Sequence, residues 1–432
     1  MMRLARRSAA LLVMGMAGAL ALSACGAGDG DDANGDDDAL SIHWLAARSA
    51  DEGMMQAIQK IADEYKEDHP GFELEIESIP SRPDYLQKVR ILAASGELPD
   101  WFDADTEPYF EEIVASGATA DVGAIYDEIG VTDNFYPIGL DYPKLEDGSI
   151  HSMTFQGNIE HFWYNKDLFA QAGVEVPTTL DELLDVSEKL EEAGITPIAM
   201  EGADRWPQMR YLSFLPFRES GNDFIEGLKS GDAQMSDPEG IAAATYFQDI
   251  SQYFQDGWSS GDYATARDLF VSGGAAIYYI GSWELPSFLD EQGELLPQFD
   301  RFAMPAAGSD DATLLTDMFA HAGIGTAINV DSDTPAMREW MKYLFSRFAD
   351  VSLFDFNSLP SMKPTTTEGL SQIKIDLLDE LNGVKDFAHV WDVRLDPDTV
   401  DVIARESTNL ALGQEDPEQF AKLVDEALAQ NQ

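Results

Sequence analysis

The stretch LSIHWLAARSADEGMMQAIQKIADEYKEDHPGFELEI, residues 40–76, decides the fold of this chain. Apolar and polar side chains alternate over residues 40–44, which predicts a strand. Apolar residues then recur at helical spacing over residues 55–65, and a His-Pro-Gly sequence ends this helix. Residues 72–76 alternate again, and a second helix is expected over roughly 85–95. The order strand, helix, strand, helix predicts an α/β fold with a parallel sheet.

The same alternation of strands and helices returns further along the chain. Thr179 is expected to cap a helix, and Glu182, three residues later, to complete a capping box. The other segments with clear strand or helix patterns are strands at 194–199 and 273–281 and amphipathic helices at 337–348 and 420–428. With about 400 residues after its N-terminal segment, the chain is too long for one simple core and is expected to form two lobes.

The first 24 residues have the pattern of an export signal. Arginines stand at positions 3, 6 and 7, and residues 9–22 carry no charged side chain. This apolar run is too short to cross ~30 Å of hydrocarbon, which argues against a transmembrane helix. The sequence Leu22-Ser23-Ala24-Cys25 resembles the bacterial lipobox, in which the cysteine receives diacylglycerol and becomes the new N-terminus. We therefore expect residues 1–24 to be a lipoprotein signal peptide and Cys25 to be lipidated.

The composition limits what the exported chain does. Cys25 is its one cysteine, so no thiol remains for a disulfide or a nucleophile. Residues 25–39 are rich in Gly and Asp and are expected to form an acidic tether at the extracellular face of the cell membrane. The chain carries 79 acidic and 27 basic residues, and loss of residues 1–24 changes its formal net charge from −52 to −55. Such a charge disfavours nucleic acid and phosphate ligands and suits solubility in a saline exterior.

Several short motifs occur in a fixed order along the chain. They are His69-Pro70-Gly71, Gly96-Glu97-Leu98-Pro99-Asp100, Trp163-Tyr164-Asn165-Lys166-Asp167-Leu168-Phe169, Ala172-Gly173-Val174, Pro177-Thr178-Thr179-Leu180-Asp181-Glu182, Leu269-Phe270-Val271-Ser272-Gly273-Gly274-Ala275-Ala276 and Gly281-Ser282-Trp283. Each motif is weak alone, but together they cover nearly all of the chain after the tether. By these motifs the chain resembles the family 1 extracellular solute-binding proteins of ABC sugar importers, the family of the maltose-binding protein.

The resemblance implies a two-lobe, periplasmic-binding-protein-like α/β fold of type II, with a hinge and a central ligand cleft. Lobe one is expected over residues 40–150 with 320–362, and lobe two over residues 151–319 with 363–432. The resemblance also implies a monomeric binding protein without cofactor or catalysis. Such a protein captures a carbohydrate and delivers it to the permease subunits of an ABC transporter in the membrane.

A sugar presents apolar C–H faces and directional hydroxyls, so its cleft combines aromatic rings with carboxylates and amides. In lobe one, Trp44 ends the first strand where the family places a ligand loop, and Arg48 follows it. Asp103 and Asp105 resemble, by position, the family's hydroxyl-accepting carboxylates. These residues are the ligand-binding candidates of the first lobe.

Lobe two supplies the other candidates. Trp283, at the end of a buried strand, is the foremost of them, and Glu284 beside it is a potential acceptor. Trp206 and Trp391 resemble the family's aromatic platforms, and Asn158 falls where a relative has a polar contact. The further candidates are Gln156 and Glu160 on the strand face of Asn158, and Asp317, Met318 and His321 near the expected crossing between lobes. Trp258 and Trp340 are assigned to packing.

Two alternatives to the sugar-binding interpretation stay open. A surface glycoside hydrolase would also combine paired carboxylates with aromatic rings, but such pairs arise by chance among 79 acidic residues. The same fold binding a polyamine, a peptide or a metal is the second alternative. The six histidines show no metal-ligand spacing, so no metal site is expected.

Overall fold

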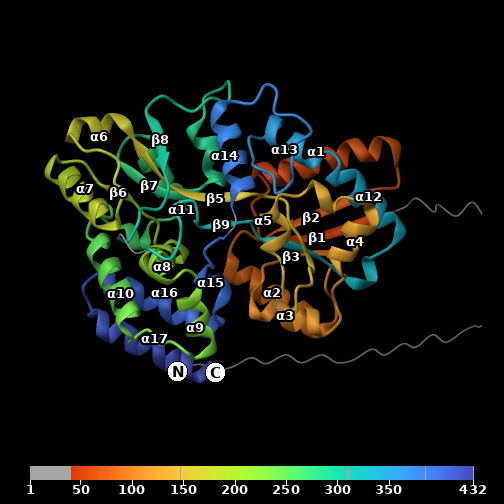
Figure 1. Ribbon diagram of the computed structural model, residues 1–432. Helices are drawn as coiled ribbons and strands as arrows, with labels where there is room; N and C mark the ends of the chain where they lie inside the picture. The colour runs from red at the N-terminus through yellow and green to blue at the C-terminus, as the bar shows by residue number, and fades with distance from the viewer. Residues whose placement is uncertain (1–39, 146, 309–310, 385, 432) are drawn as a thin grey trace, which may run out of the picture. The chain divides into compact units, whose positions relative to one another are not determined.

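The computed structural model describes residues 40–431 apart from residues 146, 309–310 and 385 (Figure 1). The expected signal peptide, Cys25 and the acidic tether lie outside the described residues. The described part belongs to one compact unit that contains two β-sheets. We call the first sheet with the helices that pack on it lobe one, and the second sheet with its helices lobe two.

The first sheet has the strand order β2-β1-β3-β10-β4. Its strands are β1 (Ser41–Ala46), β2 (Glu73–Ser78), β3 (Trp101–Ala104), β4 (Ser152–Met153) and β10 (Gly325–Ile328). β1 pairs in parallel with β2 and β3, as the opening stretch of sequence predicts. β10 comes from much later in the chain and lies antiparallel between β3 and β4.

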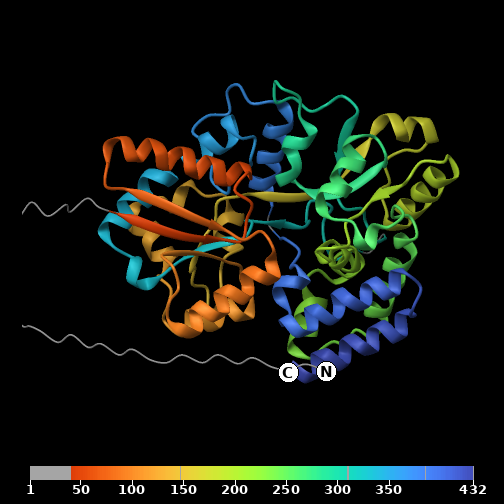
Figure 2. The same cartoon turned by 180° about the vertical axis from the view of Figure 1, so that it is seen from behind.

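Helices pack on both faces of the first sheet (Figures 1 and 2). They are α1 (Gly53–Asp68), α2 (Arg82–Ser95), α3 (Pro108–Ala115), α4 (Val122–Ile129), α12 (Pro335–Phe345) and α13 (Phe348–Asp355). Ile58, Trp340 and Leu344 are fully buried in the cluster on one face, whereas Tyr85 and Phe110 belong to the cluster on the other. α2 ends at Gly96, whose φ of 72° lies in the left-handed region that glycine adopts without strain.

The second sheet has the order β6-β7-β5-β8, and β9 also pairs with β5. Its strands are β5 (Asn158–Asn165), β6 (Ile198–Ala199), β7 (Ile277–Gly281), β8 (Phe299–Phe302) and β9 (Ala320–His321). β5 lies antiparallel to β7, β8 and β9, and β6 runs parallel to β7. β7 is buried along its whole length and ends at Gly281. Trp283 stands two residues later, in η3.

The helices of lobe two include two long helices from the C-terminal end of the chain, α16 and α17, which contact α8 and α10 (Figure 1). The helices of this lobe are α6 (Lys166–Ala172), α7 (Leu180–Glu192), α8 (Trp206–Ser220), α9 (Asp223–Ser230), α10 (Pro238–Ser251), α11 (Tyr263–Val271), α14 (Gln372–Gly383), α15 (Trp391–Arg394), α16 (Pro397–Ala411) and α17 (Pro417–Asn431). The remaining short elements are α5 (Pro137–Asp141), η1 (Thr132–Asn134), η2 (Trp258–Ser260), η3 (Ser282–Phe288) and η4 (Val330–Ser332).

Two short strands lie close to the expected crossings between lobes. β4 at residues 152–153 belongs to the first sheet. β9 at residues 320–321 pairs with β5 of the second sheet. The expected bounds of the two lobes stay a prediction. Such boundaries depend on strand pairing across the chain, and local sequence carries no signal for it.

Two local expectations change in the structure. Thr179 caps α7 by accepting a hydrogen bond from the Glu182 N–H at 3.1 Å, as expected. The Glu182 carboxylate, however, accepts from Thr178 instead of from the capping residue's own N–H. The helix expected over 337–348 is two helices, α12 and α13, which break between Phe345 and Phe348. Among the described residues, no helix combines the length and apolarity needed to cross a membrane.

Candidate functional site

Only two tryptophans keep part of their side chain exposed. All eight lie in the described part of the chain, and six of them are buried: Trp44, Trp101, Trp163, Trp258, Trp340 and Trp391. Trp206 at the start of α8 and Trp283 in η3 are half-buried. Their ring centroids lie 5.9 Å apart in an edge-to-face arrangement. An exposed aromatic pair of this kind is what the C–H faces of a sugar require.

Arg210 lies beside this pair and joins it to two carboxylates. Its guanidinium carbon lies 5.1 Å from the Trp206 ring centroid, a cation–π distance. Its Nε donates to Glu160 at 3.1 and 3.2 Å, and its Nη1 donates to Asp392 at 2.7 Å. Burial raises the pKa of Glu160, and the Arg210 charge opposes that rise. The arginine therefore compensates the charge of a buried carboxylate at the edge of the aromatic pair.

His321 at the end of β9 adds a neutral imidazole to the site. Its ring centroid lies 5.3 Å from that of Trp283. Burial and the nearby Arg210 lower the pKa of His321 to about 3, so its 3.6 Å approach to Glu160 is not an ion pair at neutral pH. Its Nδ1 accepts from the Gly323 N–H at 3.1 Å, which places the proton on Nε2. This buried Nε2–H has no hydrogen-bond partner among the described residues.

Lobe one reaches this site through Tyr142. Its ring lies 5.9 Å from the His321 ring and 5.9 Å from the Phe387 ring, and its hydroxyl donates to Asp105 at 3.4 Å. A pocket of about 360 Å³, partly open to solvent, adjoins Tyr142. Both lobes line it, with Thr106, Asp141, Tyr142 and Lys144 from lobe one and Phe387, His389, Val390, Val393 and Arg394 from lobe two.

The other lobe-one candidates form a closed network in the core. Trp44 is 0% exposed, and its indole N–H donates to Asp103 at 3.0 Å. Asp103 also accepts from the Ala47 N–H, from Arg48 and from Thr326 of β10, each at 2.8 Å. Both of its oxygens are therefore occupied, and a ligand would find neither carboxylate lone pairs nor a tryptophan face. Trp44, Arg48 and Asp103 therefore belong to the core of lobe one and not to the candidate site.

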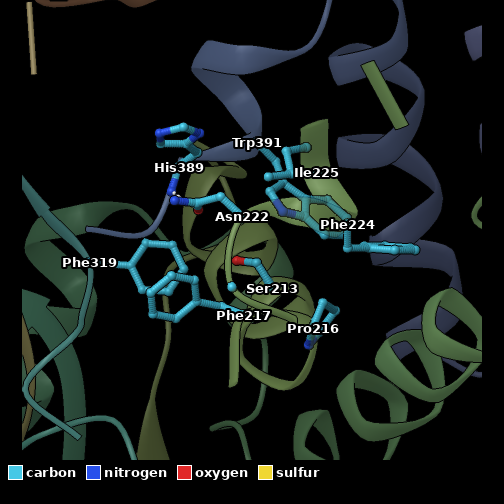
Figure 3. Close-up of a pocket in the computed structure, with 10 residues that line it drawn as sticks. Ser213, Pro216, Phe217, Asn222, Phe224, Ile225, Phe319, His389 and Trp391 are labelled. Carbon is cyan, nitrogen blue, oxygen red and sulfur yellow. Dashed lines mark hydrogen bonds between the residues drawn. The ribbon is translucent and has the colours of Figure 1, made fainter. Parts of the chain in front are cut away.

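Trp391 packs in the core of lobe two. It is 2% exposed, and its ring lies 6.2 Å from that of Phe224. It lines a second pocket of about 200 Å³ in which the His389 N–H donates to the Asn222 side chain at 2.8 Å (Figure 3). The rings of Phe217 and Phe319 line the same pocket (Figure 3). Trp391 contributes to the site only through its neighbour Asp392, which binds Arg210.

The remaining candidates have mixed placements. Asn158 is buried and pairs with His321 in the β5–β9 ladder, which places its backbone behind the site. Both Glu284 oxygens already have partners, because Oε2 accepts from the Tyr263 hydroxyl and Oε1 from the Ser287 hydroxyl. Asp317 accepts from the Leu314 N–H at 2.8 Å and thereby holds its own loop. Gln156 and Met318 form backbone bridges to Pro360 and Phe387.

Four residues of the site were absent from the sequence-based candidates: Arg210, Tyr142, Tyr263 and Asp392. Arg210 stands four residues after Trp206, so helical spacing alone would have placed the two side chains on one face. The other three meet the site through tertiary packing, for which no local pattern exists. The packing roles expected for Trp258 and Trp340 are confirmed by their burial in the two lobe cores. Within the described ranges, no group of three or more His, Cys, Asp or Glu side chains has metal-binding geometry.

Comparison with known proteins gives consistent matches. The family model of bacterial extracellular solute-binding proteins matches residues 50–347. A multiple sugar-binding protein of Streptococcus mutans is 22% identical over 356 residues, which are 78% of this chain and 79% of that protein. A putative ABC transporter periplasmic-binding protein of Escherichia coli is 24% identical over 372 residues, which are 82% of this chain and 83% of that protein.

Solved structures agree with these matches. A chitin oligosaccharide binding protein superposes with a TM-score of 0.78 at 22% identity, over 91% of this chain and 100% of that structure. A structure from work on xylan utilization by Caldanaerobius polysaccharolyticus also has a TM-score of 0.78, at 20% identity over 90% of this chain and 99% of that one. The expected periplasmic-binding-protein-like fold is confirmed by these superpositions.

Proposed function

The chain belongs to the bacterial extracellular solute-binding protein family, and we propose that it binds a sugar or oligosaccharide on Trp206 and Trp283 and delivers it to an ABC permease. The family consists of binding proteins, so the chain is not an enzyme. The observation that carries the proposal is the exposure of these two rings while the other six tryptophans are buried. Relatives named as binding several sugars, chitin oligosaccharides and α-glucosides support a carbohydrate ligand.

Polar groups around the aromatic pair suit the hydroxyls of a sugar. His321, whose Nε2–H has no hydrogen-bond partner among the described residues, places a donor near the Trp283 ring. Asp392 and Asp105 are carboxylate acceptors from opposite lobes. A ligand that bridges Asp392 and Asp105 favours the state in which the lobes are close together, because it contacts both of them only there.

We propose that Cys25 anchors the protein to the outer face of the cell membrane as a monomer. The lipobox-like sequence at 22–25 and the Gly/Asp-rich composition of the residues that follow support this. Cys25→Ser should release the protein into the medium. Detergent-phase partitioning of the wild type and the variant tests this anchor independently of the ligand.

A thermal-shift screen tests the carbohydrate proposal. The panel contains maltotriose, chitotriose, xylotriose and stachyose, with spermidine and amino acids for comparison. A ligand at 100 times its dissociation constant stabilises the folded state by ~2.7 kcal/mol. We expect at least one sugar to raise the melting temperature. A rise with spermidine and with none of the sugars would overturn the proposal, and conversion of a sugar into products would show an enzyme instead.

A further inference from the structure

The indole ring of Trp283 is held from two directions. A hypothetical Cβ on Gly281 would lie only 1.8 Å from Cζ3 of Trp283, and 2.2 and 2.4 Å from two further ring atoms. The ring therefore folds back over the end of β7, where a larger side chain would displace it. Gly281 has φ −83°, so glycine is needed there for space rather than for backbone conformation.

A chain of hydrogen bonds fixes the other side of the ring. The Trp283 Nε1–H donates to the Tyr263 hydroxyl at 3.0 Å. The Tyr263 hydroxyl in turn donates to Oε2 of Glu284, and the Ser287 hydroxyl donates to Oε1 of the same carboxylate. Burial and the Glu284 charge raise the pKa of Tyr263 above its ordinary range, so the phenol remains a donor. Each member of the chain thus has its hydrogen-bonding direction determined.

We propose that Tyr263 is a positioning residue that fixes the Trp283 ring over Gly281, so that Trp283 meets a ligand with its apolar face alone. An indole has one hydrogen-bond donor, and Tyr263 occupies it. Trp283 then recognises a C–H face and not a hydroxyl. The same chain engages both oxygens of Glu284, which stands next to Trp283 in the sequence.

This inference rests on the proposed function for its consequence on binding, but not for its structural part. The structural part is tested without any ligand by the indole N–H resonances of the full chain labelled with ¹⁵N-tryptophan. Comparison with Trp283→Phe assigns the Trp283 resonance among the eight. Tyr263→Phe should move that resonance, and the other seven should stay. If the Trp283 resonance does not move, the inference is wrong, whether or not any sugar binds.

A double-mutant cycle tests the consequence for binding, with the sugar of the panel that stabilises the chain most. Loss of a partner for a partly buried donor should lower the affinity of Tyr263→Phe about tenfold. In the Trp283→Phe background, which has no indole N–H, the same substitution should change affinity less than about twofold. An equal loss in both backgrounds would show that Tyr263 acts on the ligand directly, and would overturn the inference.

Two matched substitutions complete the experiment. Tyr246→Phe removes another buried tyrosine hydroxyl, which has no hydrogen-bond partner among the described residues, and should leave both the affinity and the Trp283 resonance unchanged. Gly281→Ala should displace the ring and lower the affinity about tenfold or more, whereas Gly383→Ala, where a Cβ meets open space, should not. Full affinity in Gly281→Ala would contradict a ring that must lie over residue 281.

Discussion

Trp44 and Trp283 each join a hydrogen-bonded network with a carboxylate, Asp103 or Glu284, but only Trp283 keeps part of its ring exposed. Trp44 lies within β1, whereas Trp283 follows the end of β7. In lobe one, Arg48 and Thr326 close over Asp103 and leave Trp44 with no exposed surface. In lobe two, Tyr263 holds Trp283 by its edge and leaves part of the ring exposed. The difference lies in which groups cover the ring.

The largest effect should follow from breaking the closed network. Asp103→Ala removes the partner of buried Arg48 and of the Trp44 N–H. Leaving a buried charge unpaired costs ~3–5 kcal/mol. Urea unfolding measures this loss, and Asp103→Asn, which keeps the shape of the side chain, should lose less. A stability of Asp103→Ala within about 1 kcal/mol of the wild type would contradict a structural role for this carboxylate.

The open region contains a buried carboxyl of its own, Glu201, five residues before Trp206. It is 1% exposed, and neither oxygen has a hydrogen-bond partner among the described residues. Burial, with Asp204 nearby, raises its pKa from 4.5 to about 9. The folded state therefore keeps a proton that the unfolded state releases, and stability falls as the pH rises from about 4.5 towards about 9.

Glu201→Gln removes this pH dependence. Relative to the wild type, the variant should gain ~2–4 kcal/mol of unfolding free energy between pH 5 and pH 8. Denaturant unfolding of both proteins at the two pH values measures the difference. If the unfolding free energies of the two proteins changed in parallel with pH, Glu201 would be ionised in the folded state, which would contradict its raised pKa.

Trp206→Phe sharpens the comparison from the exposed side. It shortens the aromatic surface and weakens the contact with Arg210, whose cation–π contribution is ~0.5–1 kcal/mol. We expect a several-fold loss of sugar affinity in calorimetric titration, with the unfolding midpoint nearly unchanged. Trp340→Phe, in the core of lobe one, is the control: it should lower the unfolding midpoint and leave the sugar affinity unchanged.

The smallest effect is expected at a partly exposed ion cluster outside both tryptophan networks. A hydrogen bond from His389, with the Arg394 charge, lowers the pKa of Glu226 to about 2. Its contribution to stability is present above about pH 4.5 and is lost as the pH falls towards about 2. In Glu226→Gln the melting temperature should fall less between pH 5 and pH 3 than in the wild type. The difference should be small, because water screens this ion pair. A profile identical to that of the wild type would remove Glu226 from the acid response.

Much of the fold follows from local sequence. The parallel order of β1, β2 and β3 and the position of α1 were predictable, since periodicity and helix-ending residues are local signals. The insertion of β10 between β3 and β4 was not, because it pairs residues more than 200 positions apart. The closure over Trp44 depends on this insertion: Arg48 donates to the Ile324 carbonyl, and Thr326 donates to Asp103.

The candidate site was predictable to a similar degree. Trp206 and Trp283 were identified because each stands where a strand gives way to a loop or helix, a position that faces a cleft in α/β folds. Trp44 met the same criterion, and only the tertiary structure separates it from the other two. Tyr142 and Tyr263 reach the site from distant segments, so their roles required the contacts themselves.

The most direct test of the account is calorimetric titration of Trp283→Ala and Trp44→Phe, with the panel sugar that stabilises the wild type most. Trp283→Ala should lose sugar affinity by about 30-fold or more and unfold at nearly the same urea concentration as the wild type. Trp44→Phe should unfold earlier and, while folded, bind the sugar with wild-type affinity. Unchanged affinity in Trp283→Ala, or a loss of affinity in folded Trp44→Phe, would contradict the assignment of the open ring to the ligand and the closed one to the core.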